Sequence, residues 1–83
     1  MNIFYFARIR ENIGISSEEI NLPSGVKTVS DLIRFLEDKG DNYSAAFAES
    51  DLIRVAVNND YVGLDYKITD KDEIAIFPPM TGG

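Results

Sequence analysis

The stretch Glu73-Ile74-Ala75-Ile76-Phe77, followed at once by Pro78-Pro79, decides how this 83-residue chain folds. Its two isoleucines alternate with Ala75 and Phe77, so a strand here turns the isoleucines toward a core and Ala75 and Phe77 outward. The strand ends at Phe77 because proline has no N–H to donate to a neighbouring strand. We therefore expect a last strand over 73–77 and, beyond it, an extended tail over 78–83 of polyproline type.

A second apolar segment, residues 3–9, is rich in aromatic and β-branched side chains and is expected to form the first strand. Alternation divides it into two faces, Ile3, Tyr5, Ala7 and Ile9 on one and Phe4 and Phe6 on the other. The first and last strands are the most apolar in the chain, which favours a position side by side at the centre of a sheet.

A helix is predicted over 29–39. Thr28 and Asp31 form a start resembling a capping box. Apolar residues follow at helical spacing, namely Val29, Leu32, Ile33 and Leu36. Lys39 and Gly40 are expected to supply a basic last turn and a left-handed stop.

The remaining segments complete the layout. Strands are expected over 18–22, 52–58 and 61–62, a helical turn over 43–49, and turns over 12–14 and 69–72. One helix across a mixed sheet is an α+β arrangement, and this order predicts a ubiquitin-like β-grasp. Residues 1–77 would form the domain and 78–83 its tail.

Composition narrows the chemistry. The chain has no cysteine and no histidine, which excludes disulfides, thiolate nucleophiles, Ser-His pairs and the common zinc sites. Eight basic against 14 acidic residues, a net charge of −6, oppose binding to nucleic acid or anionic membranes. Apolar runs are far shorter than the ~20 residues that span a bilayer, and no secretion signal is visible. We expect a cytoplasmic protein.

The chain ends Phe77-Pro78-Pro79-Met80-Thr81-Gly82-Gly83. A glycine pair on a stiff spacer can enter a channel too narrow for a Cβ, which leaves the terminal carboxyl as the only reactive group at its tip. A carboxylate is a poor electrophile, so it needs activation by a nucleotide. Because no Gly-rich phosphate loop is present, that activation must come from a partner. A frayed end or an expression scar is the alternative.

Outward aromatic residues suggest where a partner would dock. Phe6 and Phe77, with Phe4, Ala56 and Ala75 nearby, are predicted to form an apolar patch. The alternative is that these aromatic side chains are not a docking surface but pack in a second core under residues 41–51. Arg8 and Arg10 would be rim anchors for acidic groups, or ordinary solvated charges.

Three stretches of the chain resemble a known family, the small, sulfur-carrying subunit of molybdopterin synthase. They are residues 6–11 with Gly14, residues 55–58, and residues 70–83, whose ending Phe-Pro-Pro-x-Thr-Gly-Gly is the specific part. The resemblance implies that an ATP-dependent enzyme adenylates the Gly83 carboxylate and that sulfur then replaces the adenylate as a thiocarboxylate. The tail, ending in Gly82 and Gly83, would enter the large synthase subunit and donate sulfur to a pterin precursor.

The same resemblance implies a heterotetramer of two small and two large subunits, with catalysis on the large subunit. This chain would bind no cofactor, and ATP would be used by the activating partner. The partner interface would comprise Phe6, Ala75, Phe77, Pro78, Pro79, Met80 and Thr81. The chain departs from the family at Lys71, where a glycine is frequent, and at Met80, where a small β-branched residue is common.

Other functions remain open on the sequence. A terminal Gly-Gly is shared with sulfur carriers for thiamine synthesis and tRNA thiolation, and with ubiquitin-like modifiers that are joined to lysines of target proteins. A plain interaction module with an incidental tail is the third possibility.

Overall fold

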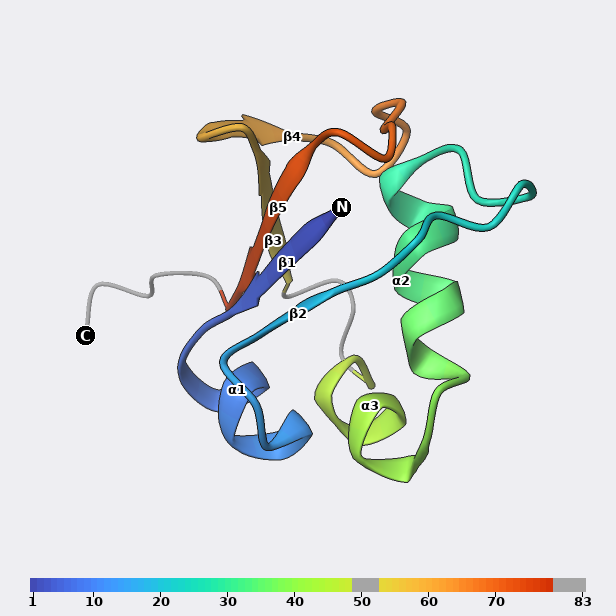
Figure 1. The fold of residues 1–83 in the computed structure, drawn as a ribbon. Helices are drawn as coiled ribbons and strands as arrows, with labels where there is room; N and C mark the ends of the chain where they lie inside the picture. Colours follow the sequence, from blue (N-terminus) through green and yellow to red (C-terminus); the bar gives the residue numbers. More distant parts are fainter. Residues whose placement is uncertain (49–52, 79–83) are drawn as a thin grey trace.

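The computed structural model describes residues 1–48 and 53–78. Within these ranges the chain forms a mixed five-stranded sheet in the order β2-β1-β5-β3-β4, with helices packed on one side (Figure 1). The elements in chain order are β1 (Asn2–Tyr5), α1 (Ala7–Ile13), β2 (Ser17–Glu19), α2 (Val29–Glu37), α3 (Asp41–Ala46), β3 (Arg54–Val57), β4 (Asp60–Val62) and β5 (Glu73–Phe77). This architecture confirms the predicted α+β, β-grasp fold.

The first and last strands lie side by side at the centre of the sheet, as predicted. β1 and β5 pair in parallel, with Ile3 opposite Ile74 and Tyr5 opposite Ile76. All four side chains are at most 1% exposed. The bounds of β5 and the inward direction of its isoleucines are confirmed.

The core lies between the sheet face that carries these side chains and α2, which stands to one side of the central strands in Figure 1. α2 contributes its buried stripe, Val29, Leu32, Ile33 and Leu36. Its predicted capping box is confirmed: the Asp31 N–H donates to Thr28 Oγ1 (3.2 Å), and the Thr28 N–H donates to Asp31 Oδ2 (3.2 Å).

The prediction that residues 3–9 form one strand is wrong. β1 ends at Tyr5, and the chain enters α1 at Ala7, whose φ is +54°. Ile9 and Ile13 then fall four residues apart on one helical face and are both buried. The predicted turn over 12–14 is reduced to Gly14, which ends α1 in the left-handed conformation at φ +95°.

α2 ends sooner than predicted, at Glu37 with a right-handed cap at Asp38. The predicted left-handed stop at Gly40 is wrong, because this residue has an extended φ of 166° and precedes α3. The helical turn expected over 43–49 falls at α3 (41–46), and the strand expected over 52–58 is the shorter β3 (54–57); residues 49 and 52 lie outside the described ranges.

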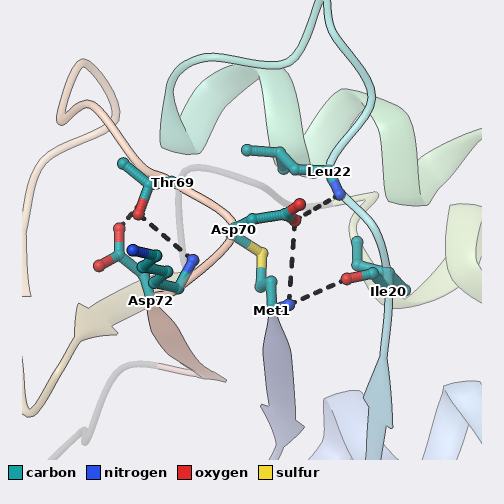
Figure 2. Close-up of polar contacts among 7 residues, drawn as sticks. Met1, Ile20, Leu22, Thr69, Asp70 and Asp72 are labelled. Carbon is teal, nitrogen blue, oxygen red and sulfur yellow. Dashed lines mark hydrogen bonds and ion pairs between the residues drawn. The ribbon is translucent and has the colours of Figure 1, made fainter.

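β2 is shorter than the predicted 18–22. Beyond it, the Leu22 N–H donates to Asp70 Oδ1 (2.6 Å), while the Met1 ammonium donates to the Ile20 carbonyl (3.0 Å) and lies 3.9 Å from the same Asp70 oxygen (Figure 2). This segment is therefore held to the turn before β5 by a side chain.

Candidate functional site

An open apolar hollow lies on the face of the sheet opposite the core. Its volume is about 430 Å³, and residues from β3, β4, β5 and the β1–α1 junction surround it. The residues that line it are Phe6, Ala7, Ala56, Asn59, Tyr61, Ala75, Phe77 and Pro78.

Strand pairing explains why these residues meet. Ala75 on β5 is opposite Ala56 on β3, and Ala56 is opposite Tyr61 on β4, so the three form one row across the sheet. The two alanines are small and leave a depression, and the larger side chains stand around it. The hollow thus follows from the register of the sheet.

Three aromatic rings form the wall of the hollow. Phe6 meets Phe77 edge to face with ring centroids 6.4 Å apart, and Tyr61 lies tilted against Phe77 at 5.6 Å. Phe6 is nevertheless 46% exposed and Tyr61 79% exposed. An exposed cluster of large apolar rings around small residues is typical of a protein-docking surface.

The structure brings together most of the residues predicted for the patch. Phe6, Ala56, Ala75, Phe77 and Pro78 all line the hollow. Phe4 is half-buried at the far end of the same row, opposite Ala75, and does not line it. The alternative, that these aromatics pack in a second core under 41–51, does not hold for the described part of that segment, because α3 packs against α1 and α2 and Phe6 stays 46% exposed.

Sequence reasoning missed Ala7, Asn59 and Tyr61 as members of this surface. Tyr61 had a signal, since an exposed aromatic in a two-residue return strand should pair with the strand before it. Ala7 had none, because nothing in its local sequence indicates the end of β1.

Arg8 and Arg10 are exposed on α1 and do not line the hollow. Arg8 lines a separate shallow groove with Asn12 and Ala45. Their role as rim anchors stays a prediction.

The predicted reactive tail, residues 78–83, has one residue among those that the structure describes. Pro79, Met80, Thr81, Gly82 and Gly83 are outside the described residues. Pro78, the last described residue, is half-buried and lines the hollow. The base of the tail is therefore part of the candidate docking surface.

Glu18 forms a polar cluster on the core side of the sheet that the sequence did not predict. Tyr5 and Tyr43 each donate a hydroxyl hydrogen bond to its Oε2 at 2.7 Å, and the Lys39 ammonium donates to Oε1 at 2.7 Å. The cluster connects β1, β2, α3 and the segment after α2, and the tyrosine hydroxyls are turned inward. We interpret the cluster as a contact that stabilises the fold by joining these segments.

Burial and hydrogen bonds together set the pKa values of the residues in this cluster. Burial disfavours the charged Glu18, but hydrogen bonds from Lys39, Tyr5 and Tyr43 outweigh it and lower the pKa of this carboxyl. Burial and the bond to Glu18 raise the pKa of Tyr43 to about 12 and raise that of Tyr5 further. Glu18 is therefore ionised at neutral pH and both tyrosines keep their protons.

Among residues 1–48 and 53–78, no group of three or more acidic side chains is arranged to hold a metal ion. Over the same ranges, no helix is both long enough and apolar enough to cross a bilayer.

Comparison with known proteins gives a match over the whole chain. The model of the ThiS family matches residues 3–83. The molybdopterin synthase sulfur carrier subunit of Escherichia coli is 34% identical, covering 100% of this chain and 99% of that protein. The protein of the same name from Dictyostelium discoideum is 41% identical, covering 98% and 93%.

Solved structures agree on the fold. A putative molybdopterin converting factor subunit 1 from Pyrococcus furiosus superposes with a TM-score of 0.75 at 34% identity, covering 95% of each chain. SAMP1 from Haloferax volcanii gives 0.75 at 26% identity, covering 100% and 98%. A chain from the complex of subunits 1 and 2 of the Helicobacter pylori molybdopterin-converting factor gives 0.63 at 20% identity, covering 99% and 96%, which indicates a shared fold.

Proposed function

Because this chain belongs to the ThiS family, we propose that it is the sulfur-carrier subunit of a molybdopterin synthase. The observation that carries the proposal is the full-length likeness to proteins of that name, 34% identity over 100% of this chain and 99% of the relative. The sequence supports it independently, since a bare Gly82-Gly83 tip follows a proline spacer.

The proposed chemistry takes place at the Gly83 carboxyl carbon. Attack of this carboxylate on ATP gives an acyl adenylate and releases pyrophosphate. Sulfide, held by the activating enzyme, then attacks the acyl carbon and displaces AMP, leaving a terminal thiocarboxylate. The thiocarboxylate sulfur attacks a carbon of the pterin precursor and displaces an oxygen leaving group. Water then cleaves the resulting thioester, which leaves the sulfur on the pterin and restores the Gly83 carboxylate.

The chain itself supplies the acyl group and a docking surface. With neither histidine nor cysteine in the sequence, nucleotide and pterin chemistry is assigned to partners. These are the adenylating enzyme and a large subunit, in a heterotetramer of two copies of each subunit. The chain is then a non-catalytic cytoplasmic subunit without a bound cofactor of its own.

The hollow has a defined energetic role in this proposal. Fixing a chain segment in one conformation costs about 1–2 kcal/mol per residue, so insertion of five tail residues costs on the order of 5–10 kcal/mol. Burial of each phenylalanine side chain contributes about 1.5–3 kcal/mol. Phe6 is 46% exposed and Phe77 half-buried in the free chain, so docking gains only a part of that amount from each. Together with Tyr61, they offset part of the cost by docking the domain beside the entrance that the tail must enter.

The test is intact-mass spectrometry of the purified chain after incubation with ATP, a sulfide source and the adenylating enzyme of the same organism. We expect a mass shift equal to one oxygen replaced by sulfur, located on the C-terminal peptide. The matched control lacks Gly83 and should stay unmodified. A wild-type chain that keeps an unmodified carboxylate would contradict the proposal.

A second candidate function is conjugation to lysines as a protein modifier. It is favoured by the similarity to SAMP1 of Haloferax volcanii, a small archaeal modifier protein, at 26% identity and a TM-score of 0.75. It differs in product, since amide-linked species of higher mass would accumulate on a denaturing gel. Their absence in cells that make the thiocarboxylate would exclude this candidate.

A further inference from the structure

Left-handed backbone gathers at the hollow. Among the described residues, the non-glycine positions with a positive φ are Ala7 (+54°), Asn58 (+51°) and Asn59 (+75°). Ala7 and Asn59 both line the hollow, and Asn58 directly precedes Asn59. Such conformations cost free energy for residues with a Cβ and concentrate at functional sites.

The two asparagines have a local explanation. They form the two-residue turn between β3 and β4, where both central residues need a positive φ and asparagine is favoured. The Asn58 side chain also donates to Asp72 Oδ1 (2.9 Å) and accepts from the Glu73 N–H (3.0 Å). Hydrogen bonds therefore compensate the conformation at this turn.

Ala7 has no such compensation. A methyl side chain makes no hydrogen bond, and glycine would adopt φ +54° without steric cost. The position is exposed and borders the hollow. An alanine here carries backbone strain that a glycine would relieve.

The backbone around Ala7 shows what this conformation achieves. Phe6 is still extended (φ −129°, ψ 154°), and its N–H donates to the Ile76 carbonyl (3.1 Å), which continues the pairing with β5. The Phe6 carbonyl already accepts from the Arg10 N–H (3.3 Å) in α1. A single residue thus converts strand to helix and leaves the Phe6 ring on the outer face, against Phe77.

We propose that Ala7 is a positioning residue: its strained left-handed backbone fixes the Phe6 ring against Phe77 and so presents the partner protein with a preformed hollow. The Cβ of Ala7 limits the backbone to few conformations, whereas glycine would let Phe6 sample several. The inference rests on the proposed docking role of the hollow. Ala7 would therefore raise the affinity for the partner protein and lower the stability of the fold.

The test compares Ala7→Gly with the wild-type full chain and with Phe6→Ala. Three quantities are measured: the thermal midpoint, the ¹⁵N order parameters of residues 6–8 in the free protein, and the Kd for the large synthase subunit of the same organism by calorimetry. For Ala7→Gly we expect a midpoint that is unchanged or up to about 5 °C higher. We expect lower order parameters at Phe6 and a Kd about 3- to 10-fold weaker.

Each outcome separates this inference from the proposed function. If Phe6→Ala binds as tightly as wild type, docking through the hollow fails, and the inference fails with it. If Phe6→Ala binds more weakly but Ala7→Gly does not, the inference alone is overturned. It is also overturned if Ala7→Gly binds more weakly with unchanged order at Phe6, because loss of a methyl contact would then suffice, or if its thermal midpoint falls.

Discussion

The two faces of the sheet are built from the same strands and have opposite character. On β5, Ile74 and Ile76 are fully buried against the helices, while Ala75 and Phe77 border an open hollow. The inner face contributes stability because its side chains leave water on folding. The outer face keeps large apolar rings exposed, which favours folding little but favours association. Alternation along one strand thus separates stability from recognition.

The largest expected effect is on the inner face. Ile76→Ala should lower the free energy of unfolding by about 2–5 kcal/mol, because it removes buried methyl and methylene groups and leaves a cavity. Denaturant unfolding monitored by circular dichroism measures the change. A loss below about 1 kcal/mol would mean that the inner face is not the densely packed core described here.

The neighbouring residue should show the reverse pattern. Phe77→Ala is expected to weaken binding of the large subunit by about 2–4 kcal/mol, as for an aromatic hot spot. Its unfolding free energy should fall much less than that of Ile76→Ala, since Phe77 is only half-buried. Calorimetry and unfolding on both variants test the pair. Equal losses of stability with unchanged affinity would remove the distinction between the faces.

Glu18 adds a polar cluster to the inner face of the sheet. The variant Glu18→Gln tests how much the charge of its carboxylate contributes to stability. The folded-state pKa of this carboxyl is lowered, so its contribution is complete above the usual value of 4.5 and is lost as pH falls through the folded value. At neutral pH we expect the variant to be about 1–3 kcal/mol less stable, because the charged acceptor of three donors is lost. Unfolding curves of the two proteins should converge in acid.

A pH-independent difference between Glu18→Gln and wild type would contradict this account of the cluster. Glutamine matches the protonated carboxyl in shape, so a constant difference would have to come from packing.

The smallest effect concerns Lys71, in the turn before the central strand β5. Lys71 is not among the described residues with a left-handed backbone, so its position does not require glycine. Lys71→Gly should lower the unfolding free energy by about 0.5–1 kcal/mol through the greater freedom of glycine in the unfolded chain. Affinity for the large subunit should not change. Increased stability would show that lysine is strained at this turn.

The sequence was sufficient for elements with a strong local pattern. β5 alternates and is closed by prolines, and α2 has both a capping box and an apolar stripe, so their types could be read directly. α1 was missed because Ala7 and Ile9 fit an alternating strand as well as a helix, and the break at Ala7 involves neither glycine nor proline. The left-handed residue there begins a helix whose Ile9 and Ile13 are buried in the core, and that burial depends on contacts distant in sequence.

The candidate site was predicted in part for the same reason. Phe6, Ala75 and Phe77 are outward by alternation within single strands. Tyr61 joins them only through the β3–β4 register, and Glu18 meets Tyr5, Tyr43 and Lys39 from separate segments. No local sequence pattern predicts these tertiary contacts, since they depend on how strands and helices are placed in three dimensions.

The central claim is that the reactive group is the terminal acyl carbon on a slender tail, delivered by a domain that docks through its outer face. The most direct measurement is pterin product formed by the reconstituted synthase with a chain extended by one phenylalanine after Gly83. We predict that this chain binds the large subunit but yields no dithiolene product, while wild type does. Product formation by the extended chain, with its extension intact by mass, would contradict the account.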